Sequence, residues 1–160
     1  MRRIKLPAFT FIEVIMVMGI FAVIVTLVGV ITFRAMNKRQ ANSEIEMLLA
    51  ALSFQQQQAV NRLLSTETTQ QYGVYFFGSG YTVFPGSSYV AGHASNRTTN
   101  LPPGVVFSTI SLPNNQVVFD EATGFVQNYE AARSSVAVIN QAGEQSLLTI
   151  NRLGVVEVTK

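Results

Sequence analysis

Apolar residues fill the chain from Phe9 to Phe33 almost without interruption. The one charged exception is Glu13, and twenty uncharged residues follow it, from Val14 to Phe33. A helix rises about 1.5 Å per residue, so these twenty residues would span about 30 Å, the thickness of the hydrocarbon core of a bilayer. A helix buried in a soluble protein is rarely apolar on every face. The pattern therefore predicts a membrane-embedded helix.

Two other interpretations of residues 1–33 explain the pattern less well. A secretory signal peptide has an apolar core of about 7–15 residues, followed by a small-x-small cleavage site. Here the apolar run is longer, and the residues that follow it, 33–36, offer no convincing site. An ordinary signal anchor fits the length but leaves Glu13 unexplained. A carboxylate deep in a bilayer costs roughly 2.5–3.5 kcal/mol on insertion scales, whereas at the headgroup level it would cost little.

The sequence remains compatible with a helix well past the apolar run, because no residue from 30 to 65 is glycine or proline. Within this stretch apolar residues recur three and four positions apart, as on one face of an amphipathic helix. They are Ile45, Leu48, Leu49, Leu52, Ala59, Val60, Leu63 and Leu64. We therefore predict an amphipathic half, residues 34–66, that continues the membrane half, residues 9–33. The run Gln55 to Gln58 is expected on a solvated or subunit-facing edge.

Ser43 and Glu46 leave an alternative open, because their spacing matches a capping box, which is a local signal for a helix N-terminus. A break near Asn42 would then separate two helices. The apolar periodicity is visible on only one side of this point, so we predict one continuous helix. It would contain about 55 residues and be about 80 Å long.

From residue 67 the pattern changes to short runs of valine, phenylalanine, tyrosine and threonine between turn residues. Hairpins are predicted across residues 78–80, 113–115 and 141–145, and residues 86–103 are expected to be irregular. The expected strands are Tyr72 to Phe77, Tyr81 to Phe84, Val105 to Leu112, Gln116 to Phe119, Ser134 to Asn140, Ser146 to Ile150 and Val155 to Val158. These about seven strands form an antiparallel β-sheet head domain, residues 67–160, whose apolar face the amphipathic helix covers. The predicted fold class is α+β.

The charges are distributed unevenly along the chain. The formal net charge is +2, but Arg2, Arg3 and Lys5 all lie in the first eight residues. Without that leader, residues 1–8, eight basic residues would face nine acidic ones, a net charge of −1. The basic balance thus belongs to the leader and not to the β domain. The absence of cysteine excludes disulfides, thiolate metal sites and cysteine nucleophiles.

The segment Ala8-Phe9-Thr10-Phe11-Ile12-Glu13 closely resembles the recognition site of type IV prepilins and pseudopilins. That motif has a short basic leader ending in a small residue, then phenylalanine, and glutamate at the fifth position of the mature chain. The resemblance implies that a prepilin peptidase cuts between Ala8 and Phe9 on the cytoplasmic side and methylates the new amine of Phe9. The residue before the cut is usually glycine, and Ala8 is a mild departure from that pattern.

The resemblance extends to the architecture, because a helical spine followed by an antiparallel sheet is the pilin fold. The ending, residues 148–158, is similar to the closing hairpin of the GspH/FimT group of minor pilins and pseudopilins. Cleavage would leave a cationic amine on Phe9, four residues and about one helical turn before Glu13. In a bundle of such helices, the amine of one subunit would neutralise Glu13 of its neighbour. Breaking such a buried pair costs about 3–5 kcal/mol, so Glu13 would fix the register of filament assembly.

Residue types that support catalysis or metal binding are sparse. His93 is the only histidine and lies in a loop rich in glycine and serine. Asp120 and Glu121 are adjacent at an expected turn. Some pseudopilins bind calcium in a loop, but two neighbouring carboxylates are more typical of a solvated turn. We predict no catalytic, cofactor-binding or metal-binding residue, and no enzymatic activity.

The leading hypothesis is a structural subunit of a type IV pilus or a type II secretion pseudopilus. Its expected partners are other subunits, the prepilin peptidase, the inner-membrane assembly platform and the lipid bilayer. It would cross the inner membrane once, with its C-terminal domain outside, before it joins a surface pilus or a periplasmic pseudopilus.

Two alternatives remain open. A DNA-binding minor pilin would need several exposed cations, and beyond residue 65 only Arg97, Arg133, Arg152 and Lys160 are available, against six acidic residues. Nucleic acid is therefore not an expected partner. A singly anchored surface protein that never polymerises is the other alternative, and it would tolerate the loss of Glu13.

Overall fold

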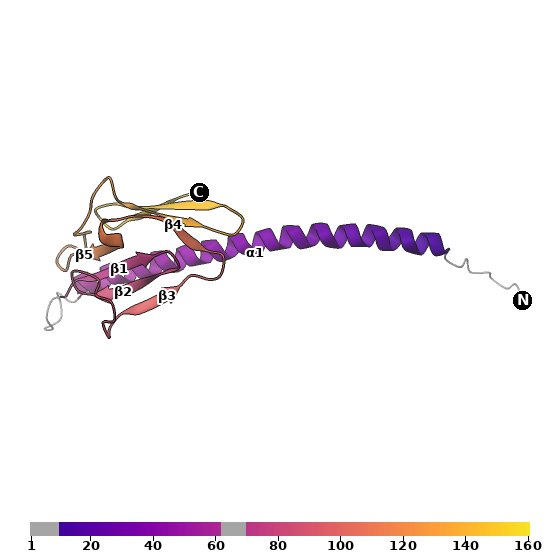
Figure 1. Cartoon of the computed structure of the whole chain (residues 1–160). Coiled ribbons are helices and arrows are strands. Elements are labelled where there is room, and N and C mark those ends of the chain that lie inside the picture. Colours follow the sequence, from indigo (N-terminus) through magenta and orange to yellow (C-terminus); the bar gives the residue numbers. More distant parts are fainter. Residues whose placement is uncertain (1–9, 62–69) are drawn as a thin grey trace, which may run out of the picture. The chain divides into compact units, whose positions relative to one another are not determined.

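The computed structural model describes residues 10–61 and 70–160 (Figure 1). It begins with one helix, α1 (Phe11–Asn61), of 51 residues. No break occurs near Asn42, so the prediction of a single continuous helix is confirmed. The expected last residues of this helix, 62–66, lie outside the described part. The chain divides into two compact units, residues 1–36 and residues 37–160.

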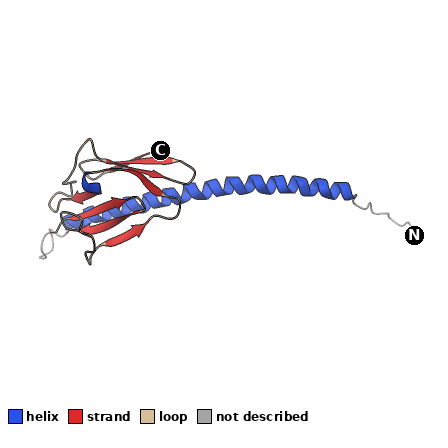
Figure 2. Cartoon of the chain, in the orientation of Figure 1, coloured by secondary structure: helices blue, strands red, loops and turns tan. Residues whose placement is uncertain are grey.

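The described part of the second unit contains eight strands in two four-stranded antiparallel sheets (Figure 2). In the first sheet the order is β3-β2-β1-β5, and in the second it is β4-β6-β7-β8. The bounds are β1 (Tyr72–Phe77), β2 (Gly80–Pro85), β3 (Arg97–Asn100), β4 (Val106–Ser111), β5 (Gln116–Phe119), β6 (Ser135–Ile139), β7 (Gln145–Ile150) and β8 (Val156–Thr159). The α+β class is confirmed.

Two of the three predicted hairpins are present. Strands β1 and β2 pair across residues 78–79, with Phe77 opposite Gly80, and β6 pairs with β7 across the turn at residues 140–144. Gly73 and Gly80 stand opposite aromatic residues of the β1–β2 pair. A Cβ atom on Gly73 would lie 2.5 Å from the Phe84 ring. Glycine is therefore needed inside these strands so that the opposite ring can lie against the backbone.

The predicted hairpin across residues 113–115 is wrong. Strand β4 pairs with β6, whereas β5 pairs with β1 in the other sheet. The connection is a short 3-10 helix, η2 (Pro113–Asn115), in which Asn114 and Asn115 have positive φ. The chain therefore changes sheet at this point. All four residues of β5 are buried, so its partner is chosen by packing in the core and not by the turn beside it.

Residues 86–103 were expected to be irregular, and this expectation is also wrong. The prediction of about seven strands in a single sheet is wrong as well, because eight strands form two sheets in the described part of the domain. Strand β3 lies in this stretch and pairs with β2. Its four residues are all exposed, so the alternation of apolar and polar residues that marks a strand is missing. The hydroxyl groups of Thr82 and Thr98, 2.9 Å apart, form a hydrogen bond across the two strands.

The core of the second unit forms where one stripe of α1 packs with both sheets. The buried stripe consists of Ala41, Ile45, Leu48, Leu52 and Ala59. Large buried side chains of both sheets belong to the same cluster, among them Phe76, Phe119, Leu148 and Ile150. Fully burying one such side chain contributes about 1.5–3 kcal/mol.

A polar side chain fixes how α1 meets the turns of the β domain. The Gln56 Nε2 atom donates to the carbonyl oxygens of Gly124 and Leu153, each at 2.8 Å. Gly124 and Gly154 both have positive φ, and a Cβ atom on Gly154 would lie 2.7 Å from Gln56 Nε2. These glycines let two turns that are distant in sequence approach the same helical residue.

The outer edge of β5 is closed by Asn128. Its Oδ1 atom accepts from the Val118 N–H at 3.1 Å, and its Nδ2 atom donates to the Gln116 carbonyl oxygen at 2.8 Å. The side-chain amide thus takes the place of a neighbouring strand, and backbone groups that would otherwise be unpaired are satisfied.

Replacement of Asn128 by alanine removes both hydrogen bonds and leaves two backbone groups of β5 without partners. We expect the free energy of unfolding to fall by about 1–3 kcal/mol. Denaturant unfolding of the full chain in lipid nanodiscs, followed by circular dichroism, measures this loss. Gln127→Ala is the matched control, because Gln127 is exposed and neighbours Asn128. Equal losses in the two variants would contradict the role assigned to Asn128.

Candidate functional site

The candidate assembly site lies at the N-terminal end of α1, where Glu13 occupies the first turn. The Thr10 carbonyl oxygen accepts from the backbone N–H groups of Glu13 and Val14, at 3.1 and 3.3 Å. Thr10 and Glu13 have the sequence spacing of a capping box, and the helix begins at Phe11, directly after Thr10. Within the described part of the chain no basic side chain pairs with Glu13. A carboxylate here is favoured by the helix dipole.

The predicted cleavage and methylation positions, Ala8 and Phe9, lie outside the described residues. Both stay predictions. The structure therefore places only one of the three predicted site residues, Glu13, and it places that residue at an exposed position.

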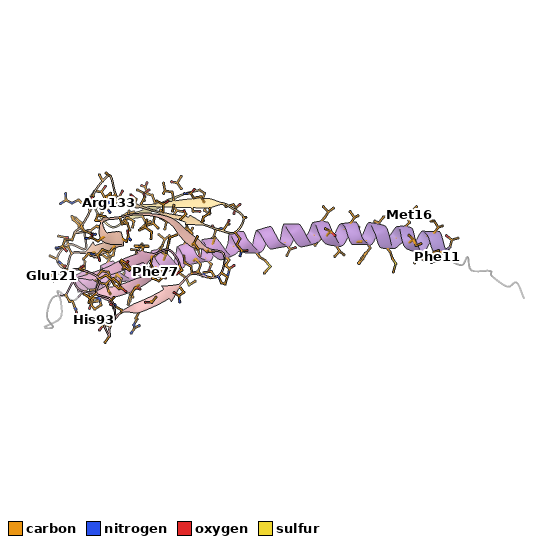
Figure 3. The ribbon with its side chains drawn as sticks, in the orientation of Figure 1. Phe11, Met16, Phe77, His93, Glu121 and Arg133 are labelled. Atoms are coloured by element: carbon orange, nitrogen blue, oxygen red, sulfur yellow. The ribbon has the colours of Figure 1, made fainter. Side chains whose placement is uncertain are left out.

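The helix surface beyond Glu13 is apolar and uncovered. Phe11–Gly29 forms a stretch of 19 residues that is long and apolar enough to cross a membrane, and every one of them is exposed. Phe11 and Met16 project from this stretch in Figure 3. The Thr26 hydroxyl donates to the Ala22 carbonyl oxygen at 2.8 Å, so this polar group is satisfied inside the helix. Such a surface is stable in lipid or against other apolar helices.

The cations of the β domain are dispersed. Arg133 donates to the Leu112 carbonyl oxygen at 2.9 Å and lies 3.9 Å from a carboxylate oxygen of Glu130. Arg152 lies in the turn between β7 and β8, whereas Lys160 follows the other end of β8. The pairing register therefore separates these two residues by the length of the strand. The described part of the domain shows no basic cluster that could follow a phosphate backbone.

The sparse residues with catalytic or metal-binding chemistry are held within local turns. The Asp120 Oδ1 atom accepts from the Ala122 N–H and from the N–H and hydroxyl of Thr123. These hydrogen bonds, first of all those from Thr123, lower the pKa of Asp120. The His93 Nδ1 atom accepts from the Ser95 N–H at 3.3 Å. Among residues 10–61 and 70–160, no three histidine or acidic side chains gather where they could hold a metal ion.

A groove that the sequence analysis did not predict lies between α1 and the first sheet. Its volume is about 700 Å³, and its lining includes Gln55, Tyr81 and Arg97. The expectation for the glutamine run is wrong for Gln55, which is only 5% exposed. A signal was present in the sequence, because Gln55 continues the three-and-four spacing of the buried residues Leu52 and Ala59.

Tyr81 is a buried ionisable residue of this groove. Burial raises the pKa of its phenol, a hydrogen bond with the Thr99 side chain lowers it, and the negative charge of Glu44 raises it further; the net direction is upward. Partial burial also raises the pKa of Glu44. The Tyr81 phenol therefore favours its neutral form over a wider pH range than a free phenol.

Comparison with known proteins identifies no relative. No family model, curated protein or solved structure matches this chain.

The Tyr81 phenol holds its proton more tightly in the folded chain than in the unfolded chain, whose tyrosine pKa is about 10. Its stabilising contribution is complete below about pH 10 and is lost as the pH rises through the higher pKa of the folded state. We expect the absorbance titration of wild-type protein minus that of Tyr81→Phe to show a tyrosinate midpoint above 10. A difference titration centred at or below 10 would contradict the burial of this phenol.

Proposed function

We propose that this protein is a structural subunit of a type IV pilus or of a type II secretion pseudopilus, assembled through α1. The observation that carries the proposal is Glu13, the single acidic residue of the first turn, followed by a helix that is apolar on every face. A carboxylate at this position is expensive in a low-dielectric environment unless a cation neutralises it. The free amine created by cleavage before Phe9 would supply that cation from a neighbouring subunit.

The exposed apolar surface supports the same proposal. The residues from Phe11 to Gly29 need cover on all sides, and before assembly the lipid bilayer would provide it. In a filament the same surface would be covered by equivalent helices of other subunits. Gly19 has open space around its Cα atom, so a neighbouring helix could approach closely there.

The second half of α1 also keeps an apolar stripe that its own β domain leaves uncovered. Met47 and Phe54 are seven residues apart and are 48% and 55% exposed, with the exposed Ala50 between them. Residues seven apart lie on the same face of a helix. This stripe would give each subunit a further contact with its neighbours, beyond the membrane half.

The two alternatives fit the geometry less well. A DNA-binding minor pilin would need a basic surface, and Arg97, Arg152 and Lys160 lie on separate elements. A singly anchored surface protein that never polymerises gives Glu13 no role. The non-polymerising alternative differs from the proposal in what it predicts for the two experiments below, whereas a DNA-binding minor pilin would be distinguished by a salt-dependent gel shift.

The first experiment concerns processing. Coexpression with a prepilin peptidase should remove residues 1–8 and add one methyl group to Phe9, and intact-protein mass spectrometry measures both changes. Ala8→Gly restores the residue usual before the cut, and we expect it to be processed at least as fast. An intact N-terminus at Met1 in a peptidase-bearing host would contradict the proposal.

The second experiment concerns assembly. Glu13→Ala removes the carboxylate that would pair with the neighbour's amine, at a cost of about 3–5 kcal/mol for each buried pair broken. We expect filament or pseudopilus assembly to be lost while the β domain stays folded, as judged by sheared fractions and circular dichroism. Glu46→Ala is the control, since Glu46 is exposed on the same helix outside the apolar half. Normal assembly of Glu13→Ala would contradict the role assigned to Glu13, whereas absence of the wild-type chain from the sheared fraction would favour the anchored, non-polymerising alternative.

A further inference from the structure

Four exposed apolar side chains come from three segments that meet near the C-terminal end of α1. They are Val60 of the helix, Phe125 of the loop after β5, and Leu153 and Val155 of the turn between β7 and β8. Their exposed fractions are 37%, 40%, 51% and 54%. Grouped apolar side chains on the surface of a folded domain normally mark an interaction site. We call these four residues the turn patch.

Contacts between the three segments bring the turn patch together. The Val126 N–H donates to the Arg152 carbonyl oxygen at 2.9 Å, so the loop after β5 lies against the turn before β8. A Cβ atom on Gly124 would lie 2.8 Å from the Val60 side chain, so the same loop also lies against the helix. The apolar side chains of the three segments therefore share one region of the surface.

The backbone that carries the turn patch is fixed by hydrogen bonds of its own. The Asn151 Oδ1 atom accepts from the N–H groups of Leu153 and Val155, at 2.9 and 3.0 Å. The Phe125 carbonyl oxygen accepts from the Asp120 N–H at 2.8 Å. These segments are therefore ordered before a partner arrives, which lowers the entropy cost of docking.

The turn patch and the stripe at Met47 and Phe54 face in different directions. Val60 follows Phe54 by six residues, and at about 100° per residue their side chains are separated by about 120° around the helix axis. Contact between the two surfaces therefore requires two copies of the chain. Such a contact joins unlike surfaces, so it can repeat from copy to copy, whereas a patch that pairs with itself gives a closed dimer.

We propose that the turn patch of one copy docks on the stripe at Met47 and Phe54 of a neighbouring copy. Both surfaces are apolar and exposed, and every copy carries one of each. Val60 lies about ten residues beyond the middle of the stripe, so two parallel helices in this contact would be offset by about 15 Å along their axis. An axial offset combined with a rotation generates an open helical array, which is the geometry of a filament.

This inference rests on the proposed function and names the surface that covers the stripe in the filament. The pairing of Glu13 with a Phe9 amine would need an offset of four residues, about 6 Å, so it would involve a different neighbour. A subunit of a helical filament has several neighbours. An unrelated apolar protein is the less favoured occupant, because assembly supplies one stripe for every turn patch.

The test exploits the absence of cysteine from the sequence. A tagged copy with Leu153→Cys is coexpressed with an untagged copy with Phe54→Cys in a peptidase-bearing host, and the sheared filaments are oxidised. A disulfide needs Cα atoms within about 7 Å, so this pair should give at least about fivefold more mixed dimer than a pair that does not meet. The control pair is Leu147→Cys with Phe54→Cys, because Leu147 is a 40% exposed leucine of β7 outside the turn patch.

Leu153→Ser tests the same contact without a cross-link. Because Leu153 is exposed, the melting temperature of the full chain in lipid nanodiscs should stay unchanged. The amount of sheared filament should fall about fivefold, which corresponds to about 1 kcal/mol lost at an interface residue. Leu147→Ser is the matched control and should leave both measurements at the wild-type level.

The inference is overturned if filaments form and the mixed dimer is no more abundant than the control dimer; the proposed function would then stand. It is also overturned if Leu153→Cys cross-links to itself more than to Phe54→Cys, because the turn patch would then pair with its equivalent. If the wild-type chain never enters the sheared fraction, the proposed function is contradicted, and the inference falls with it.

Discussion

The fold of the second unit depends on the burial of one stripe of α1 against two sheets. Leu48 and Leu52 are almost completely buried in the same cluster as Phe76 of the first sheet and Leu148 of the second. Two small four-stranded sheets have apolar faces that neither could leave in water. The helix joins them into a single core, because its stripe contacts apolar residues of both. A substitution that disturbs this stripe would therefore affect both sheets together.

Polar side chains then specify the arrangement that burial alone would leave loose. Apolar packing tolerates small rotations and slips, whereas a hydrogen bond requires a particular partner at a particular distance. Gln56 joins α1 to the turns at Gly124 and Leu153, and Asn128 closes the edge of β5. Gln56 satisfies backbone carbonyl groups 68 and 97 residues away in the sequence, and Asn128 satisfies backbone groups of the edge strand β5. These hydrogen bonds therefore select one arrangement of the helix and strands in addition to stabilising the fold.

The parts of the fold that local sequence determines were predictable. The long helix follows from the absence of glycine and proline between residues 30 and 65, and the β1–β2 hairpin follows from Gly78-Ser79-Gly80 between two strand-forming runs. The crossover at Pro113 was mistaken for a hairpin, because Pro-Asn-Asn is suited to a turn whichever strand pairs next. The pairing of β5 is decided instead by the distant residues of β1, which no local pattern reveals. Strand β3 was missed because a polar edge strand carries no apolar alternation.

In the candidate site, as in the fold, features set by neighbouring residues in the sequence were predictable, and features set by tertiary packing were not. Glu13 could be singled out from sequence, because one charge in a long apolar run is a local contrast. The groove could not, since it depends on how residues of α1 and of the first sheet, distant in sequence, come together. Within four consecutive glutamines, Gln55 is buried, Gln56 binds two turns and Gln57 is exposed, so identical residues acquire different roles from the helical phase alone.

This chain combines a low content of charged residues with exposed apolar side chains. Only 12% of the residues are charged, and apolar side chains remain exposed on both halves of α1. A free soluble protein with such surfaces would tend to associate, since extended exposed apolar patches are normally interaction sites. In the proposed function lipid or neighbouring subunits cover the apolar half and the stripe at Met47 and Phe54. The described surface of the β domain would then carry dispersed charges of both signs, which does not suit a polyanion such as nucleic acid.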